Sequence, residues 1–169
     1  AFHSIDDDPY WDESAYYRFT LRQIEDELEE PSEEIERMCF EVVERAVRDE
    51  AILHRLGIPT AFWEYVADTW RRQERNLYGR LDFSYRGTGP AKLLEYNADT
   101  PTTLYESAIF QWVWLEQAME RGLIPEGCDQ FNSLHEKLID ALKRLGIEGV
   151  LHLACAPDSE EDRGTIEYL

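Results

Sequence analysis

The chain has few lysines and lacks the loop that one widespread class of nucleotide-binding proteins uses. Lys92, Lys137 and Lys143 are its only lysines among 169 residues. The spacing Gly-x-x-x-x-Gly-Lys-Ser/Thr, whose backbone amides and lysine cradle phosphates, does not occur. The chain therefore has few lysines, and no glycine-rich loop of this kind, with which to hold the phosphates of a nucleotide.

Cysteine and histidine are also too sparse to indicate a metal or redox centre. The three cysteines, Cys39, Cys128 and Cys155, are odd in number and form no Cys-x-x-C pair. None of the four histidines belongs to a His-Glu-x-x-His motif. We expect the cysteines to be buried small hydrophobic residues or residues without a particular role, and the histidines to be satisfied or exposed.

Long apolar runs are missing, and positive charge is in deficit. No run approaches the ~20 residues that span a bilayer, and no signal peptide is visible, so we expect a cytoplasmic protein without a membrane partner. The 36 acidic and 17 basic side chains give a net charge of −19. Such a field repels nucleic acid and attracts cations, including polyamines.

The apolar pattern predicts a helix-rich α/β fold in one domain, residues 1–169, with a single core. The predicted helices are residues 12–29, ended by Pro31; 35–56, closed by Gly57; 59–74, with Phe62, Val66 and Trp70 inward; 109–121, stopped by Gly122; 132–144, closed by Gly146; and one from 160 onward. We expect a short buried strand at 150–154, which with a β-hairpin gives a mixed sheet.

The predicted hairpin joins residues 78–85 to 91–96 through the turn 86–90, which contains two glycines and a proline. Successive side chains of a strand alternate between faces. If opposite residues have numbers summing to about 177, Asp82 faces Glu95 and Arg80 faces Asn97. This register also gathers four apolar residues on the other face, and we therefore prefer it to a one-residue slip. They are Leu81, Phe83, Leu94 and Tyr96.

The polar face of this hairpin is a candidate magnesium and phosphate site. Mg²⁺ takes one or two carboxylates and completes its shell with water and substrate phosphates, so Asp82, Glu95 and Asn97 suit it. Arg80 beside them could bind phosphate oxygens bidentately. A solvated strand face with an ordinary ion pair remains the alternative, although crowded carboxylates repel one another without a cation.

Two motifs resemble the glutathionylspermidine synthase family. One is Arg-x-Asp-Phe at 80–83 followed by Lys-x-x-Glu-Tyr-Asn-Ala-Asp-Thr-Pro-Thr at 92–102. The other is the aromatic opening at 10–20 with the glutamate-rich helix after it. Members of this family are ATP-grasp carbon–nitrogen ligases, so the resemblance implies a pre-ATP-grasp-like fold, ATP and Mg²⁺ as cofactors, and substrates such as glutathione and spermidine.

The resemblance also implies roles for individual residues. Asp82, Glu95 and Asn97 match magnesium ligands, and Arg80 matches an arginine near the transferred phosphoryl group. Thr100 and Thr102 stand where the family has small hydroxyl residues that touch the glutathione peptide. Here both are threonine rather than serine, with Pro101 between them.

An acidic cluster at 158–162 is a second candidate for substrate binding. It follows the predicted strand at 150–154 almost directly, and ligands of open α/β sheets collect at the carboxyl ends of strands. Glu160 and Glu161 are the residues that we assign to substrate there.

Two functions of different class remain open. The first is the amino-terminal part of an ATP-dependent peptide–amine ligase, in a chain that we expect to be the first half of a longer enzyme and inactive alone. The second is a non-catalytic acidic module that binds divalent cations or polyamines. Arg80 favours the ligase, because a passive cation site gains nothing from a positive charge.

Overall fold

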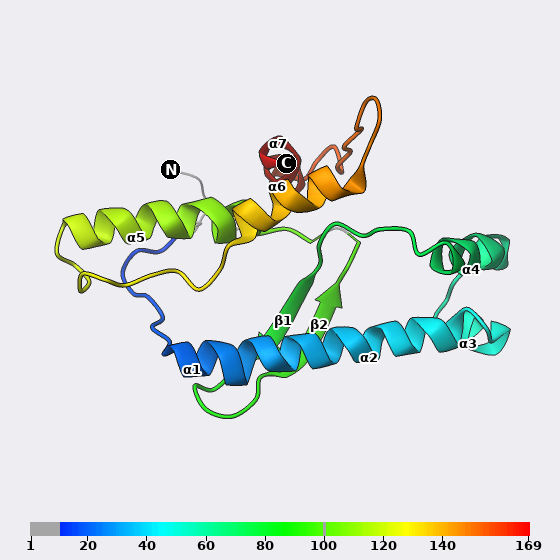
Figure 1. Cartoon of the computed structure of the whole chain (residues 1–169), viewed down its shortest axis with the longest axis horizontal. Helices are drawn as coiled ribbons and strands as arrows, with labels where there is room; N and C mark the ends of the chain where they lie inside the picture. The colour runs from blue at the N-terminus through cyan, green and yellow to red at the C-terminus, as the bar shows by residue number, and fades with distance from the viewer. Residues whose placement is uncertain (1–10, 100) are drawn as a thin grey trace.

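The computed structural model describes residues 11–99 and 101–169, and a long helical rod comes first among its elements (Figure 1). The rod runs through α1 (Leu21–Ile24), the π-helical turn η1 (Glu25–Glu29) and α2 (Glu30–Ala46). Thr20 caps it: the Thr20 hydroxyl accepts the Gln23 N–H, and the Gln23 side chain accepts the Thr20 N–H. This reciprocal cap starts the helix at Leu21, later than the predicted residue 12.

Pro31 does not end this helix, contrary to the prediction. It lies in the first turn of α2, where a missing N–H and a fixed φ are tolerated, and the wider turn η1 precedes it. In a continuous α-helix the N–H of residue 31 would bond the carbonyl of Glu27. That carbonyl instead accepts the N–H of Ala91, at 2.9 Å, from the hairpin. A distant residue thus satisfies the group that proline leaves unpaired.

The remaining helices follow the predicted order with shifted ends. They are α3 (Glu50–Arg55), the 3-10 turn η2 (Thr60–Phe62), α4 (Trp63–Arg71), the π-helical turn η3 (Glu106–Phe110), α5 (Gln111–Glu120), α6 (Leu134–Leu145) and α7 (Glu160–Tyr168). The predicted helix 35–56 is two helices, because Asp49 caps a new start by accepting the Ala51 N–H. Gly57, Gly122 and Gly146 follow helix ends with left-handed φ of 73°, 67° and 61°, as predicted.

The hairpin is formed by β1 (Arg80–Ser84) and β2 (Lys92–Asn97), which pair antiparallel. Asp82 pairs with Glu95 and Arg80 with Asn97, so the predicted register is confirmed. A bulge between Asp82 and Phe83 then shifts the pairing, and Phe83 faces Leu93. Leu94 was wrongly predicted on the apolar face: it is 70% exposed.

The predicted strand at 150–154 is absent. These residues are exposed and carry no regular secondary structure. A strand needs a partner for its backbone groups, and the sheet within residues 11–99 and 101–169 has only the two strands of the hairpin. The helix-rich fold with a β-hairpin is confirmed, whereas the mixed sheet is an antiparallel pair.

Few apolar residues of the described part of the chain are buried: proline aside, there are eleven, and five of them are alanines. One cluster joins Leu115, Ala118 and Ile124 around α5. Among the described residues no large side chain is fully buried, and Phe62, predicted to point inward, is 55% exposed. No described helix is long and apolar enough to cross a membrane.

The hairpin extends from the rod toward α7 (Figure 1). Its turn end is fixed on the rod by the Ala91 bond and by the Gln23 side chain, whose Nε2 donates to the Gly87 carbonyl at 2.9 Å. The Tyr85 hydroxyl also donates to the Glu27 carboxylate. The open end of the hairpin is left to carry the polar residues.

Gly79 permits the close approach of the Tyr96 ring to the start of β1. A Cβ at Gly79 would lie 2.6 Å from Tyr96 Cε2 and 3.3 Å from the Asn97 carbonyl oxygen. We predict that Gly79→Ala lowers the free energy of unfolding by about 1–3 kcal/mol, since the half-buried ring must move. Urea denaturation measures the change.

Gly164 in α7 is the matched control. A Cβ there meets nothing within 4 Å, and the residue lies inside a helix. Gly164→Ala should therefore stabilise the protein by up to about 1 kcal/mol. Equal stability of the two alanine variants would contradict the packing ascribed to Gly79.

Candidate functional site

The polar face of the hairpin carries the predicted site residues on adjacent strands. Because directly paired residues of an antiparallel sheet point to the same side, Asp82 and Glu95 share a face, and Arg80 and Asn97 pair in the same register. Arg80, Asp82 and Asn97 are half-buried, and Glu95 is exposed.

Arg80 forms a bidentate ion pair with Asp82. Its Nε donates to Oδ1 at 2.8 Å and its Nη2 donates to Oδ2 at 3.0 Å. The hydrogen bond to Asp82 raises the pKa of Arg80, burial opposes the rise, and the charges of Asp82, Glu95 and Glu161 add to it. The guanidinium is therefore permanently charged and lies among three carboxylates.

The donor set around this pair fits a hard cation. Asp82 and Glu95 could offer carboxylate oxygens and Asn97 an amide oxygen, and two carboxylates with an amide are within what Mg²⁺ accepts. No hydrogen bond or ion pair occupies the Glu95 carboxylate in the described part of the chain. Within residues 11–99 and 101–169, the polar face included, no group of three or more His, Cys, Asp and Glu side chains is placed to hold a metal.

The segment after β2 meets the same face. Arg80 Nη1 donates to Thr102 Oγ1 at 3.2 Å, so the arginine joins the predicted metal ligand Asp82 to a predicted substrate residue. Asn97 Oδ1 accepts the Asp99 N–H at 3.2 Å and turns the chain away from β2. Thr100 lies outside the described residues.

Glu160 and Glu161 lie in the first turn of α7 and are exposed. Ser159 caps this helix by accepting the Asp162 N–H at 3.2 Å. The negative charge of Glu161 contributes to the raised pKa of Arg80, so the start of α7 lies near the polar face. The strand used to predict these residues is absent, but the acidic turn does approach the hairpin.

The sequence reasoning missed two features beside this face. The Tyr78 hydroxyl donates to the Pro101 carbonyl at 3.1 Å. Thr103 has a φ of +65°, which is rare for a β-branched residue. No spacing or composition signal in the sequence indicates either feature.

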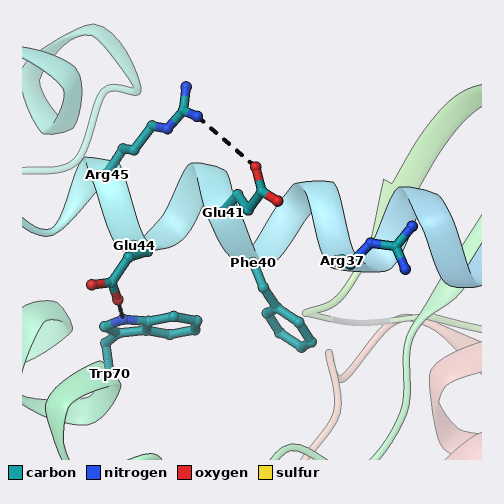
Figure 2. A pocket seen from close by; sticks show the side chains of 6 residues that line it. All are labelled: Arg37, Phe40, Glu41, Glu44, Arg45 and Trp70. Carbon is teal, nitrogen blue, oxygen red and sulfur yellow. Dashed lines mark hydrogen bonds and ion pairs between the residues drawn. The ribbon is translucent and has the colours of Figure 1, made fainter.

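A separate hollow lies between α2 and α4 (Figure 2). Its volume is about 370 Å³, and it is lined by Arg37, Phe40, Glu41, Glu44, Arg45 and Trp70. Glu44 accepts the Trp70 Nε1–H, and Glu41 pairs with Arg45 at 3.9 Å. None of the predicted site residues lines it.

A smaller hollow of about 210 Å³ lies between α2 and the apolar face of the hairpin, lined by Ser32, Glu33, Glu36, Gly79, Leu81 and Tyr96. Leu81 and Tyr96 are the cross-strand pair next to Asp82 and Glu95, on the opposite face. The candidate site is therefore the open polar face and neither of these hollows.

Several known proteins are similar in sequence to this chain over most of its length. A putative acid–amine ligase of Haemophilus influenzae is 38% identical over 98% of the chain and 42% of the relative. The bifunctional glutathionylspermidine synthetase/amidase of Escherichia coli is 28% identical over 94% of the chain and 24% of the relative. The trypanothione synthetase of Crithidia fasciculata is 30% identical over 72% of the chain and 19% of the relative.

The chain thus spans less than half the length of each of these relatives. The family model that describes the glutathionylspermidine synthase pre-ATP-grasp region matches residues 1–169, from the aromatic opening through the hairpin to α7. The chain belongs to the glutathionylspermidine synthase family and corresponds to its pre-ATP-grasp region.

Proposed function

We propose that this chain is the amino-terminal portion of an ATP-dependent ligase that joins a peptide carboxylate to an amine. The observation that carries the proposal is the register of the hairpin, which sets Asp82 across from Glu95 and Arg80 across from Asn97. The names of the relatives favour glutathione as the peptide and spermidine as the amine. A cytoplasmic location would supply these substrates and ATP.

In this proposal Asp82, Glu95 and Asn97 hold Mg²⁺. Bound magnesium neutralises charge on the phosphates of ATP and orients them. The exposed Glu95 carboxylate is free to take a ligand, whereas Asp82 first shares its oxygens with Arg80. The ion pair keeps the Asp82 carboxylate oriented until that ligand arrives.

Arg80 serves as the phosphate clamp. Its fork already binds one pair of oxygens, those of Asp82, at 2.8 and 3.0 Å. The same planar fork matches phosphate oxygens, on which charge accumulates during phosphoryl transfer. Arg80 would stabilise that charge when it turns from Asp82 toward the phosphate.

The substrates would meet at this arginine. The peptide carboxylate attacks the γ-phosphorus of ATP and ADP leaves, which gives an acyl phosphate; the amine then attacks the acyl carbon, phosphate leaves and the nitrogen loses a proton. Thr100 and Thr102 would contact the peptide, and Glu160 and Glu161 would bind the cationic amine. The chain contributes positioning and charge to both steps.

A non-catalytic module for divalent cations or polyamines is the alternative. It would use the same carboxylates, but Arg80 would oppose it by repelling the cation that Asp82 and Glu95 attract. The role of Arg80 therefore distinguishes the two functions.

We predict that Arg80→Ala in the complete ligase lowers kcat by a factor on the order of 10²–10³, the scale of losing one transition-state donor. Magnesium affinity should change little. Arg80→Lys should restore only part of the rate, because an ammonium cannot reproduce the bidentate fork. Steady-state kinetics and metal titration measure the two effects. Intact turnover with tighter metal binding in Arg80→Ala would support the binding module instead.

Glu95→Gln should weaken metal binding by about tenfold or more, equivalent to about 1.4 kcal/mol, because a charged oxygen ligand becomes neutral. Titration with Mn²⁺, followed by electron paramagnetic resonance, gives the dissociation constant. Glu116→Gln, an exposed residue of α5, removes the same charge away from the site and should leave the constant unchanged. If both variants lose affinity equally, general charge and not a site holds the ion.

The isolated chain of 169 residues should show no ligase turnover with ATP, Mg²⁺, glutathione and spermidine, because it offers few lysines and no glycine-rich loop to hold the nucleotide. Release of phosphate and formation of the amide product measure turnover. Reproducible Mg²⁺-dependent product would place the nucleotide-binding groups within these residues.

A further inference from the structure

Two hydrogen bonds hold the segment that follows β2 against the start of β1. We name this segment, Pro101, Thr102 and Thr103, the acceptor segment. The Tyr78 hydroxyl donates to the Pro101 carbonyl at 3.1 Å, and Arg80 Nη1 donates to Thr102 Oγ1 at 3.2 Å. Pro101 is buried and Thr102 is half-buried, so both contacts are partly shielded from water.

The last residue of the acceptor segment has a strained backbone. The φ of Thr103 is +65°, in the left-handed region that a β-branched residue seldom adopts. Its carbonyl accepts the Ser107 N–H at 3.0 Å, which ties the strained corner to the helix that follows. Such a conformation persists only where neighbouring contacts fix the chain on both sides. Tyr78 and Arg80 fix the other side.

Tyr78 and Arg80, the two residues that bond the acceptor segment, differ in their other roles. In the proposed reaction Arg80 must turn toward phosphate, and its hold on Thr102 changes when it does. Tyr78 takes no part in binding phosphate. Burial, and then the charge of Asp162 in α7, raise the pKa of Tyr78, so its hydroxyl keeps its proton and remains a donor at neutral pH.

Tyr78 also lies between the two regions assigned to substrates. Its hydroxyl bonds the acceptor segment. The charge that helps to raise its pKa belongs to Asp162, which is next to Glu161 in the first turn of α7. Movement of this side chain would therefore affect the peptide side of the site first.

We infer that Tyr78 is a positioning residue that fixes the acceptor segment, and thereby sets where the peptide carboxylate lies relative to Arg80. The inference rests on the proposed ligase function. The single bond from the Tyr78 hydroxyl to the Pro101 carbonyl makes the role separable from the bulk of the ring, which packs whether or not the hydroxyl is present.

Tyr78→Phe in the complete ligase tests this role. The KM for the peptide substrate should rise about tenfold, the effect of losing one partly buried hydrogen bond of about 1.4 kcal/mol. The KM values for ATP and for the amine, and kcat, should stay within about twofold. Hydrogen exchange at the amides of residues 102–104 should become about tenfold faster.

Tyr85→Phe is the matched control. It also removes the hydroxyl of a half-buried tyrosine, one that donates to Glu27 at the far end of the hairpin. Peptide KM and exchange at residues 102–104 should stay as in the wild type.

Unchanged exchange in Tyr78→Phe, or an equal rise of peptide KM in both variants, would overturn the positioning role. A wild-type enzyme without peptide ligation would refute the proposed function. The exchange measurement would still decide whether Tyr78 fixes the segment.

Discussion

The hydrogen bond from the Ala91 N–H to the Glu27 carbonyl determines where the hairpin lies on the helical rod. It exists because Pro31 has no N–H for that carbonyl. Lys92, the next residue, begins β2, so the bond anchors the strand at its first position. A slip of one residue would turn every side chain of β2 to the other face. A proline inside a helix thus helps to keep Glu95 opposite Asp82.

The sequence predicts this face well and its surroundings poorly. Alternating apolar residues, with a turn rich in glycine, suffice for the pairing of Asp82 with Glu95, because this register sets Leu81 across from Tyr96 on the other face. The bulge after Asp82 depends on backbone geometry that no residue type there signals. The rule that proline ends a helix fails at Pro31 because the unpaired carbonyl finds a partner 64 residues away. The apolar run at 150–154 fails as a strand because no strand among the residues that the structure describes pairs with it.

The contacts that join the polar face to the acceptor segment were beyond sequence reasoning for a different reason. Strand alternation places Arg80 and Asp82 on one face, but it does not determine that Arg80 also reaches Thr102. That contact, like the bond from Tyr78 to Pro101, depends on how the chain turns after Asn97. The turn includes the left-handed Thr103, a conformation that propensity argues against. Tertiary contacts, and not local preference, set this part of the site.

The ion pair of Arg80 with Asp82 is partly exposed to water, and this exposure explains how the two side chains could bind each other first and ligands later. The Arg80 and Asp82 side chains are 30% and 39% exposed, and ion pairs open to water contribute little to stability. In the proposed ligase, separating them to bind phosphate and metal would cost correspondingly little, whereas a fully buried pair would resist exchange.

Stabilisation of a transition state requires a site from which water is excluded, because charges interact more strongly there than at an exposed surface. The chain exposes 13197 Å², whereas a folded monomer of its mass exposes about 8,700 Å². In the proposed ligase the chain by itself would therefore supply the arrangement of charges, and the low dielectric would come from whatever covers the polar face.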